Sequence, residues 1–245
     1  MKFTIITPCY NAEKYIGDNI KSVINNGYDN FEHIIVDDKS ADESIERIME
    51  FKDDRIKLII HHHNLKQAIA RNTAIKESTG DWIIPLDADD MMIPDAIHNR
   101  LARIKEYPDY ECFYGYALKI KGNVSYEQAI QDMNKLDRHP SRLHSQGMCY
   151  KKTVFEKFGL YYDLPTKEDK ELNYRLGIHD FSPFDKKILS RRVHNNLAFY
   201  RRHSESTHKI RVADKKEDKT IVKLFNKRIE QLKKEGITKE NTPQL

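Results

Sequence analysis

The sequence is poor in the residues and patterns that mark secreted, fibrous and membrane proteins. Its three cysteines, Cys9, Cys112 and Cys149, are widely spaced and form neither a disulfide framework nor a zinc-ligand pattern, which favours a reducing compartment. Only 9 glycines and 8 prolines occur among 245 residues, which excludes collagen-like and low-complexity chains. No apolar run approaches the roughly 20 residues of a membrane helix, and the opening segment MKFTIITPCYN is apolar only briefly. We therefore expect a soluble, cytoplasmic protein without a signal peptide or transmembrane segment.

What the chain does contain is balanced between apolar and charged residues. It is 39% hydrophobic and 33% charged, and its 245 residues are enough for one sizeable α/β domain with a continuous core. The formal net charge of +4 is a slight excess. This excess is compatible with an anionic ligand or surface, but it does not by itself indicate nucleic-acid binding.

Strand-like and helix-like segments alternate along the first hundred residues. Short apolar runs predict strands over 3–8, 31–38, 55–61 and 81–90. Apolar residues at helical spacing lie between these runs. A capping box from Ser40 to Glu43 predicts the start of the second helix, and Gly80 predicts the end of the third. Because such alternation requires right-handed crossovers, the expected fold class is α/β, with a mostly parallel central sheet and helices on both faces.

The second half of the chain is less regular. Its predicted elements are a helix between Pro94 and Pro108, a strand over 110–122, a strand end and short helix stopped by Gly159, a helix over 167–178 and a strand over 189–203. Residues 122–141 are polar, and we expect a mobile segment there that acts as a lid. From about Asp214 the apolar spacing predicts an amphipathic helix, and the tail after Gly236 is expected to be disordered.

Polar residues at the predicted strand ends should share one crevice, because ligands of parallel sheets bind at the carboxyl ends of the strands. These residues are Thr7, Tyr10 and Asn11 after the first strand, Asp37 and Asp38 after the second, and Asp87 and Asp89 after the fourth. Two carboxylates as close as Asp87 and Asp89 repel each other unless a cation is present, and Mg²⁺ and Mn²⁺ prefer carboxylate and phosphate oxygens. The pair therefore predicts a site for a metal-bound diphosphate, with an ordinary acidic loop or helix cap as the alternative.

The order of several motifs resembles that of the inverting family 2 glycosyltransferases, which have the GT-A fold. The segments that carry the resemblance are TPCYNAEKYI (7–16), IIVDDKSAD (34–42), AIARNTAIKESTGDWIIPLDADD (68–90), EDKEL (168–172) and YRRHSEST (200–207). The resemblance implies a GT-A domain over 1–205 and a helical extension and tail over 206–245. Within the domain it implies a nucleotide-sugar-binding half, 1–107, and an acceptor and catalytic half, 108–205.

The donor-binding residues implied by the resemblance lie mainly at the strand ends. They are Thr7, Pro8, Tyr10, Asn11, Asp38, Arg71, Asp87, Ala88 and Arg201. Those of the first strand would line the base and ribose, with Tyr10 offering a flat face for stacking. Asp38 would accept a hydrogen bond from the base, which is consistent with the ring N–H of uracil. Arg71 would contact the base edge or the diphosphate, because its planar fork of donors suits either.

The metal-binding and catalytic residues are implied in the same way. Asp89 would ligate Mn²⁺ or Mg²⁺ directly, Asp87 would hold the ribose or reach the metal through water, and His203 would approach the metal or the diphosphate. Asp169 would be the general base that activates the acceptor, with Glu168 beside it orienting the acceptor or the sugar. An acid-rich helix N-terminus is the alternative interpretation of this last pair.

Other residues keep structural alternatives or depart from the family pattern. Asn11, Asp37 and Asp38 could each cap a helix, and Arg71 could pair with a surface carboxylate. Three consecutive histidines at 61–63 point to alternating faces of a strand end, so they make a poor chelate. Lys66 stands where the family often has a glycine, which either alters the approach of this loop to the nucleotide or adds a cation there.

The expected function is metal-dependent transfer of a sugar from a nucleotide diphosphate donor, a UDP-sugar, to an acceptor hydroxyl with inversion. The expected acceptor is a glycan or surface-polysaccharide precursor, and basic residues between Lys186 and Lys216 leave a modified nucleic-acid base as a second class. The rival classes are a sugar-phosphate nucleotidyltransferase, which would usually show a glycine before Gly17, and a non-catalytic nucleotide-sugar-binding module. The C-terminal helix could form a homodimer, and the basic surface could dock at the inner membrane face.

Overall fold

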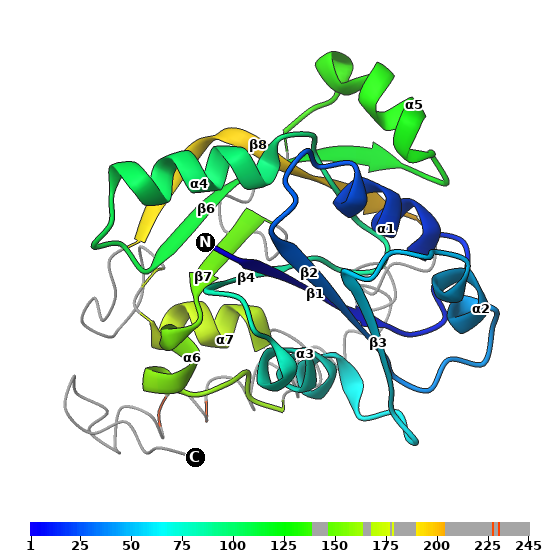
Figure 1. The fold of residues 1–245 in the computed structure, drawn as a ribbon, viewed down its shortest axis with the longest axis horizontal. Helices are drawn as coiled ribbons and strands as arrows, with labels where there is room; N and C mark the ends of the chain where they lie inside the picture. The colour runs from blue at the N-terminus through cyan, green and yellow to red at the C-terminus, as the bar shows by residue number, and fades with distance from the viewer. Residues whose placement is uncertain are drawn as a thin grey trace.

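The computed structural model describes residues 1–138, 147–163, 168–176, 178 and 190–203, together with Lys227 and Glu230 (Figure 1). Within these residues the chain forms an 8-stranded sheet with strand order β3-β2-β1-β4-β7-β6-β8-β5. The strands are β1 (Phe3–Cys9), β2 (Phe31–Asp37), β3 (Ile56–Ile60), β4 (Trp82–Pro85), β5 (Met91–Met92), β6 (Cys112–Lys121), β7 (Met148–Lys151) and β8 (Ser190–Arg202). The helices are α1 (Ile16–Ile24), α2 (Ser44–Met49), α3 (Lys66–Glu77), α4 (Ala96–Glu106), α5 (Tyr126–Gln131), the short 3₁₀ helix η1 (Met133–Lys135), α6 (Thr153–Phe158) and α7 (Glu168–Arg175).

Helices pack on both faces of the sheet, because successive side chains of a strand point to opposite sides. Ile6 of β1 lies in one apolar cluster with Ala74 of α3, Phe155 of α6 and Leu172 of α7. Its neighbour Ile5 lies in another cluster, with residues of α1 and α4. Figure 1 shows α1 and α4 along one side of the strands and α3, α6 and α7 along the other. The predicted α/β class is confirmed.

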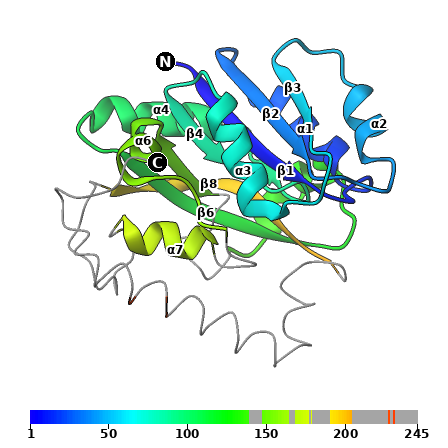
Figure 2. The ribbon, with the colours of Figure 1, turned by 90° about the horizontal axis from the view of Figure 1, so that it is seen from below.

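The strands that the sequence predicted most clearly, β1 to β4, form a parallel block. β1 pairs in parallel with both β2 and β4, and β2 pairs in parallel with β3. β7 then lies antiparallel between β4 and β6, so the strand direction alternates there. In Figure 2, β1 to β3 lie toward one end of the sheet and β6 and β8 toward the other. The carboxyl ends of β1, β2 and β4 therefore meet at one edge.

The long strand β8 is irregular where it pairs with β6. Arg192 of β8 pairs with Tyr114 of β6, and Ala198 pairs with Ala117. β8 therefore has extra residues between these two pairs, which form a β-bulge. Beyond the bulge the parallel pairing continues without interruption to Arg202. This last part of β8 also pairs with β5, the short strand that follows the acidic turn and that the sequence did not predict.

The capping box predicted from Ser40 to Glu43 is wrong, because α2 begins only at Ser44. The Asp42 carboxylate accepts the backbone N–H of Ser44 at 3.0 Å and its hydroxyl at 2.5 Å. The Ser40 hydroxyl instead donates to Asp37 at 2.5 Å. The loop after β2 is therefore tied to the strand end through Ser40 and to the start of α2 through Asp42.

The two glycines predicted as helix stops have different roles. Gly159 follows α6 with φ +81°, a conformation that favours glycine, and this prediction is confirmed. α3, however, ends at Glu77, before Gly80. A Cβ on Gly80 would lie 2.5 Å from the Thr4 hydroxyl and 2.8 Å from its backbone nitrogen. Gly80 is therefore required by close packing on β1 rather than by the helix end.

The segment expected to be a mobile lid is packed instead, as far as residue 138. It contains α5 and η1, and Tyr126 and Ala129 of α5 are 3% and 1% exposed. Both lie in a cluster with Leu118 of β6 and Phe199 of β8. Residues 139–141 and the tail after Gly236 lie outside the described residues, as does the helix predicted from Asp214 apart from Lys227 and Glu230, which are both helical. Of the helices that the structure does describe, none is long and apolar enough to cross a membrane.

Candidate active site

An acidic turn formed by residues 87–90 lies just beyond the carboxyl end of β4. The Asp90 N–H donates to the Asp87 carbonyl at 3.0 Å, which closes a β-turn with Ala88 and Asp89 at its corner. All four residues of β4 are buried, so the chain enters the turn from a fixed position. The two predicted ligands leave this turn toward different partners, Asp87 toward α3 and Asp89 toward the end of β8.

Asp89 meets His203, although the two are 114 residues apart in the chain. The Asp89 carboxylate lies 3.0 Å from Nε2 of His203, and the His203 side chain is only 9% exposed. The imidazole packs against the ring of Tyr15, with 4.6 Å between the ring centroids. Its Nδ1 atom has no hydrogen-bond partner among the described residues. The structure thus brings two of the predicted metal ligands together.

Asp87 meets Arg71, which also binds Glu168. The Arg71 guanidinium lies 2.5 Å from Asp87 and 2.6 Å from Glu168, and its side chain is 2% exposed. Burial alone would lower the pKa of Arg71, but the two carboxylates outweigh it and raise that pKa. The guanidinium also stacks over Tyr161, 5.4 Å from the ring centroid. Arg71 therefore joins the acidic turn to α7.

Helix α7 carries the predicted catalytic pair, and the two carboxylates differ in burial. Glu168 is 5% exposed, and this burial raises its pKa against the opposing effect of Arg71. Asp169 is less buried and lies close enough to Arg71 to contribute to its raised pKa. Adjacent helical residues point in different directions. Glu168 is committed to the ion pair with Arg71, which leaves Asp169 as the carboxylate outside that pair.

Asp38, predicted to bind the base, is 3% exposed and holds the loop before α3. One carboxylate oxygen accepts the Leu65 N–H at 2.8 Å and lies 2.8 Å from His61 Nδ1, and the other accepts the Lys66 N–H at 2.7 Å. The second ring nitrogen of His61 lies 3.0 Å from the Thr73 hydroxyl. Both nitrogens of His61 are therefore engaged within the protein. A carboxylate can accept about four hydrogen bonds, so Asp38 retains room for one more donor.

The residues predicted at the end of β1 lie in three different environments. Thr7 is fully buried and its hydroxyl lies 2.8 Å from His33 Nε2, so this side chain belongs to the core. Tyr10 is 52% exposed and presents its ring to solvent. Asn11 does not cap α1; it has φ +49° and accepts the Ala41 N–H at 2.8 Å. Asn11 thereby ties the end of β1 to the loop after β2.

A pocket of about 330 Å³ opens beside this junction. Its lining residues are Asn11, Glu13, Lys14, Ala41 and Asp42.

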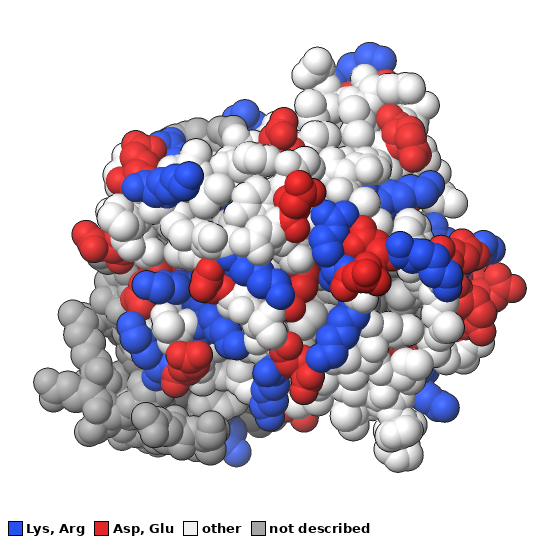
Figure 3. Space-filling view, viewed as in Figure 1, with Lys and Arg blue, Asp and Glu red and all other residues white. Residues whose placement is uncertain are grey.

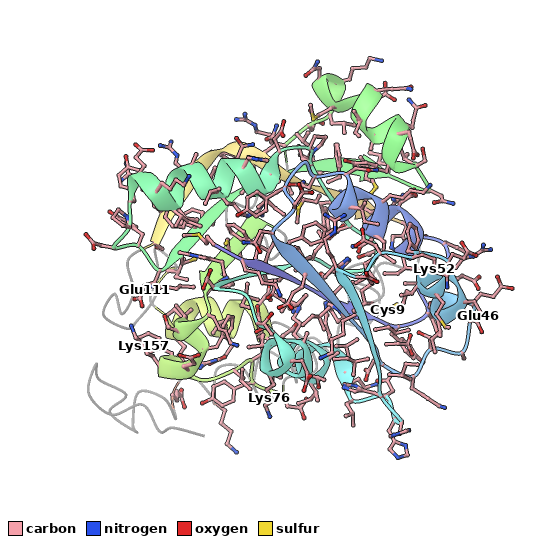
Figure 4. All side chains as sticks on the ribbon, viewed as in Figure 1. Cys9, Glu46, Lys52, Lys76, Glu111 and Lys157 are labelled. Carbon is pink, nitrogen blue, oxygen red and sulfur yellow. The ribbon has the colours of Figure 1, made fainter. Side chains whose placement is uncertain are left out.

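Pro8 is half-buried, and Ala88 is 7% exposed in a cluster with Cys9. Burial, followed by the nearby Asp37, raises the pKa of the Cys9 thiol to about 12 (Figure 4). That thiol stays protonated and is not a nucleophile.

Arg201, predicted to bind the donor, is fully buried. Its Nε donates to the Asp89 carbonyl at 2.8 Å, and one terminal nitrogen donates to the Gly122 and Val124 carbonyls at 3.0 and 2.8 Å. The backbone N–H of Arg201 donates to the Asp90 carboxylate at 2.7 Å. In this arrangement Arg201 supports the acidic turn from the side of β8.

Several residues that the sequence did not single out complete the site. Gln67 donates to Asp87 at 3.0 Å, and Asn19 donates to two carbonyls of the acidic turn. Tyr15 and Tyr161 stack on His203 and Arg71. Tyr15 lies within a motif that carries the family resemblance and Gln67 directly before one, but only contacts distant in sequence reveal the roles of all four.

The side chains beside the acidic turn fit one divalent ion as part of its coordination shell. Asp89 offers an oxygen and His203 a nitrogen, and both suit Mn²⁺. Their separation of 3.0 Å is about that of neighbouring ligands on an octahedral ion with bonds of about 2.1 Å. Among the described residues no group of three His, Cys, Asp or Glu side chains could hold an ion alone. The remaining positions would therefore fall to diphosphate oxygens and water.

Comparison with known proteins places this geometry in a family. The model of Glycosyl transferase family 2 matches residues 4–160. A UDP-Glc:alpha-D-GlcNAc-diphosphoundecaprenol beta-1,3-glucosyltransferase from Escherichia coli, WfgD, is 39% identical over 99 residues, which are 40% of this chain and 39% of that protein. The matches span 39% to 51% of the length of three such curated relatives.

Two solved structures share the fold. That of S. aureus TarS 1-349 in complex with UDP-GlcNAc aligns with a TM-score of 0.67 at 17% identity, covering 86% of this chain and 61% of the TarS 1-349 chain. That of the mannosyltransferase PcManGT from Pyrobaculum calidifontis, in complex with GDP-Man and Mn²⁺, aligns with a TM-score of 0.63 at 16% identity, covering 86% and 59%.

The sheet order, the acidic turn and these alignments define a domain of the GT-A type. The chain belongs to glycosyl transferase family 2, as the match over residues 4–160 shows. The resemblance inferred from the sequence motifs is confirmed.

Proposed function

We propose that this protein transfers a sugar from a UDP-sugar donor to an acceptor hydroxyl, with inversion at the anomeric carbon and with Mn²⁺ or Mg²⁺ bound. One observation carries the proposal: acidic residues from both halves of the chain meet at a single sheet edge. Asp87 and Asp89 come from the turn after β4, and Glu168 and Asp169 come from α7. Arg71 links the two sets through ion pairs of 2.5 and 2.6 Å.

The donor would lie across the ends of β1, β2 and β4. The exposed ring of Tyr10 would stack on the base, and Asp38 would accept its ring N–H. The diphosphate would lie beside Asp89 and His203, where a metal ion, when bound, would neutralise the charge of the leaving group. The TarS complexes with UDP support a uridine donor, while the GDP-Man complex of PcManGT keeps guanine as the competing base.

The transfer itself requires one general base. As the acceptor oxygen attacks the anomeric carbon, its proton passes to the Asp169 carboxylate. The bond from that carbon to the phosphate oxygen breaks, and the nucleotide diphosphate leaves with the electron pair. Attack from the face opposite the diphosphate inverts the configuration. Glu168, held by Arg71, would fix the position of α7 and orient the sugar or the acceptor.

The proposed acceptor is a glycan or a precursor of a surface polysaccharide. The Escherichia coli relative is named for transfer to alpha-D-GlcNAc-diphosphoundecaprenol, which supports a lipid-linked saccharide. For a nucleic-acid acceptor, the face shown in Figure 3 offers basic side chains interspersed with acidic ones rather than one continuous basic patch. A steep loss of transfer to a polymer acceptor with added salt would favour the nucleic-acid alternative.

A screen of nucleotide sugars tests the proposed function. UDP-, GDP- and TDP-sugars are each mixed with the protein and Mn²⁺, Mg²⁺ or EDTA, and thermal stabilisation and nucleotide diphosphate release are recorded. We expect a UDP-sugar to stabilise the protein and to be turned over only with metal. Asp89→Ala should abolish the metal-dependent turnover, and the exposed Asp109→Ala, on the turn after α4, should not.

Three outcomes would contradict the proposal. Turnover that is unaffected by EDTA would exclude the metal, and release of pyrophosphate would identify a nucleotidyltransferase. Binding of a nucleotide sugar without any turnover, with or without candidate acceptors, would identify a binding module.

A further inference from the structure

One face of α1 carries a row of buried polar side chains. Asn19 and Ser22 are fully buried and lie one turn apart on α1, and Asn26, 1% exposed, continues the row in the turn that follows the end of the helix at Ile24. They alternate with buried apolar residues such as Ile20 and Val23. Burying a polar group without partners destabilises a fold, so the contacts of this row need a structural reason.

The side-chain amide of Asn19 binds the acidic turn. Its Nδ2 donates to the Asp87 carbonyl and to the Asp90 carbonyl, both at 2.9 Å. Both neighbours are acceptors, so the nitrogen must face the turn. The Oδ1 atom is buried and has no hydrogen-bond partner among the described residues. The orientation of Asn19 is therefore determined by the turn.

The two carbonyls that Asn19 binds are the first and the last of the turn. They bracket Ala88 and Asp89, the two residues at its corner. From the opposite side, Nε of Arg201 donates to the Asp89 carbonyl at 2.8 Å. Hydrogen bonds from α1 and from β8 thus hold the backbone of residues 87–90 in place. The direction of the Asp89 carboxylate toward His203 follows from these hydrogen bonds.

We propose that Asn19 is a positioning residue for the metal-binding turn. It acts through the backbone: with its two hydrogen bonds it holds the Asp89 carboxylate at the distance from His203 at which both can bind one ion. The inference rests on the proposed function, because it requires that the ion bind there. Groups that orient ligands in this way typically change metal affinity about 10- to 100-fold when removed.

Asn26, in the turn just after α1, provides a matched control. It is 1% exposed, its Nδ2 donates to the Ile93 carbonyl at 2.7 Å, and its Oδ1 accepts the Ile97 N–H at 2.9 Å. Asn26 therefore makes two side-chain hydrogen bonds, as Asn19 does. Its partners, however, lie beyond the acidic turn, one shortly before α4 and one in its first turn.

The experiment measures Mn²⁺ binding rather than turnover. Mn²⁺ is titrated into wild type, Asn19→Ala and Asn26→Ala at a fixed UDP concentration, and free Mn²⁺ is followed by electron paramagnetic resonance with UDP alone as the blank. Thermal melts are recorded for each protein. We expect both variants to lose comparable thermal stability. Only Asn19→Ala should bind Mn²⁺ about 10-fold or more weakly.

Wild-type Mn²⁺ affinity in Asn19→Ala, or an equal loss in Asn26→Ala, would overturn the inference while leaving the proposed function intact. Absence of Mn²⁺ binding by wild type with UDP present would instead overturn the proposed metal site, and the inference with it. If Asn19→Ala does not fold, Asn19→Ser, which keeps one donor, takes its place. Unchanged affinity in folded Asn19→Ser would equally overturn the inference.

Discussion

The two halves of the chain hold their site residues in different ways. In the half built from β1 to β4, backbone groups fix the crevice: Asp38 accepts N–H groups of the loop before α3, and Asn19 binds carbonyls of the acidic turn. Although the backbone N–H of Arg201 donates to Asp90, site residues in the half built from β6 to β8 and α7 reach the crevice mainly through their side chains. Glu168 does so through Arg71, and His203 through Asp89.

This difference separates two tasks of the proposed enzyme, which are binding the donor and transferring its sugar to the acceptor. The half proposed to bind the donor takes its shape from local loops and from a parallel block that is complete by the end of β4. The half proposed to bind the acceptor depends on the Arg71–Glu168 and Asp89–His203 contacts, which join elements about a hundred residues apart. Changes on the acceptor side should therefore impair transfer more than donor binding. Changes to the contacts between the halves should impair both.

Asp169→Asn should give the largest effect and the cleanest separation of the two tasks. Loss of a general base lowers turnover by about 10²- to 10⁴-fold, while the donor site remains as built. Turnover with saturating donor and acceptor is compared with donor affinity from calorimetry. The control is Asp163→Asn, an exposed aspartate shortly before α7. Unchanged turnover, or a parallel loss of donor affinity, would remove Asp169 from the role of base.

Arg71→Leu breaks the contact between the halves. It leaves two largely buried carboxylates, Asp87 and Glu168, without their shared cation, which typically destabilises a fold by about 3–5 kcal/mol. Urea unfolding measures the loss. The double variant Arg71→Leu/Glu168→Gln should recover part of it, because one uncompensated charge is removed. Wild-type stability in Arg71→Leu would show that the ion pairs do not hold the halves together.

Acid should weaken the donor half through His33. Burial lowers the pKa of His33 to about 3, from an ordinary value of about 6.5. Because the unfolded chain takes up this proton first, stability is lost as pH falls from about 6.5 toward 3, by up to about 1.4 kcal/mol per pH unit. His33→Gln should flatten this pH dependence in urea unfolding between pH 7 and 5. Equal slopes for wild type, His33→Gln and the exposed-site control His98→Gln would contradict it.

Lys66→Gly should give the smallest effect and tests the loop that Asp38 holds. Lys66 has φ +74°, which costs a non-glycine residue about 1–2 kcal/mol, so glycine should raise stability by up to about 1 kcal/mol after its own entropy cost. The control is Lys76→Gly, an exposed position near the end of the same helix (Figure 4), which should lower stability by about 0.5–1 kcal/mol. Thermal unfolding compares the two, and equal signs would refute the strain at residue 66.

The sequence predicted the parts of the site that follow from local pattern. Asp87 and Asp89 come at the end of a buried apolar run, and parallel alternation places that end beside β1 and β2. The EDKEL motif likewise lies at the start of a helix, α7, as predicted. These features need only strand period, helix period and the handedness of crossovers.

Other parts depend on contacts that no local pattern contains. The partner of Arg71 on α7 is 97 residues away, and Asn19 binds a turn that follows it by 68 residues. A polar residue on an amphipathic helix predicts a solvent-facing position, and here it is buried. The Thr7 side chain shows the same dependence on distant contacts. Its place at a strand end suggested the crevice, but its hydroxyl lies beside His33, inside the sheet.

The bulge in β8 has a consequence for how this chain tolerates changes in length. Arg201 and His203 reach the two sides of Asp89, its carbonyl and its carboxylate, because they are two residues apart at the end of one strand. A residue inserted between Arg192 and Ala198 would fall where the register of β8 against β6 is already irregular. The bulge would accommodate it without changing the pairing after Ala198. The same insertion after Ala198 would turn both side chains to the opposite face and disrupt the proposed ion site without replacing any of its residues.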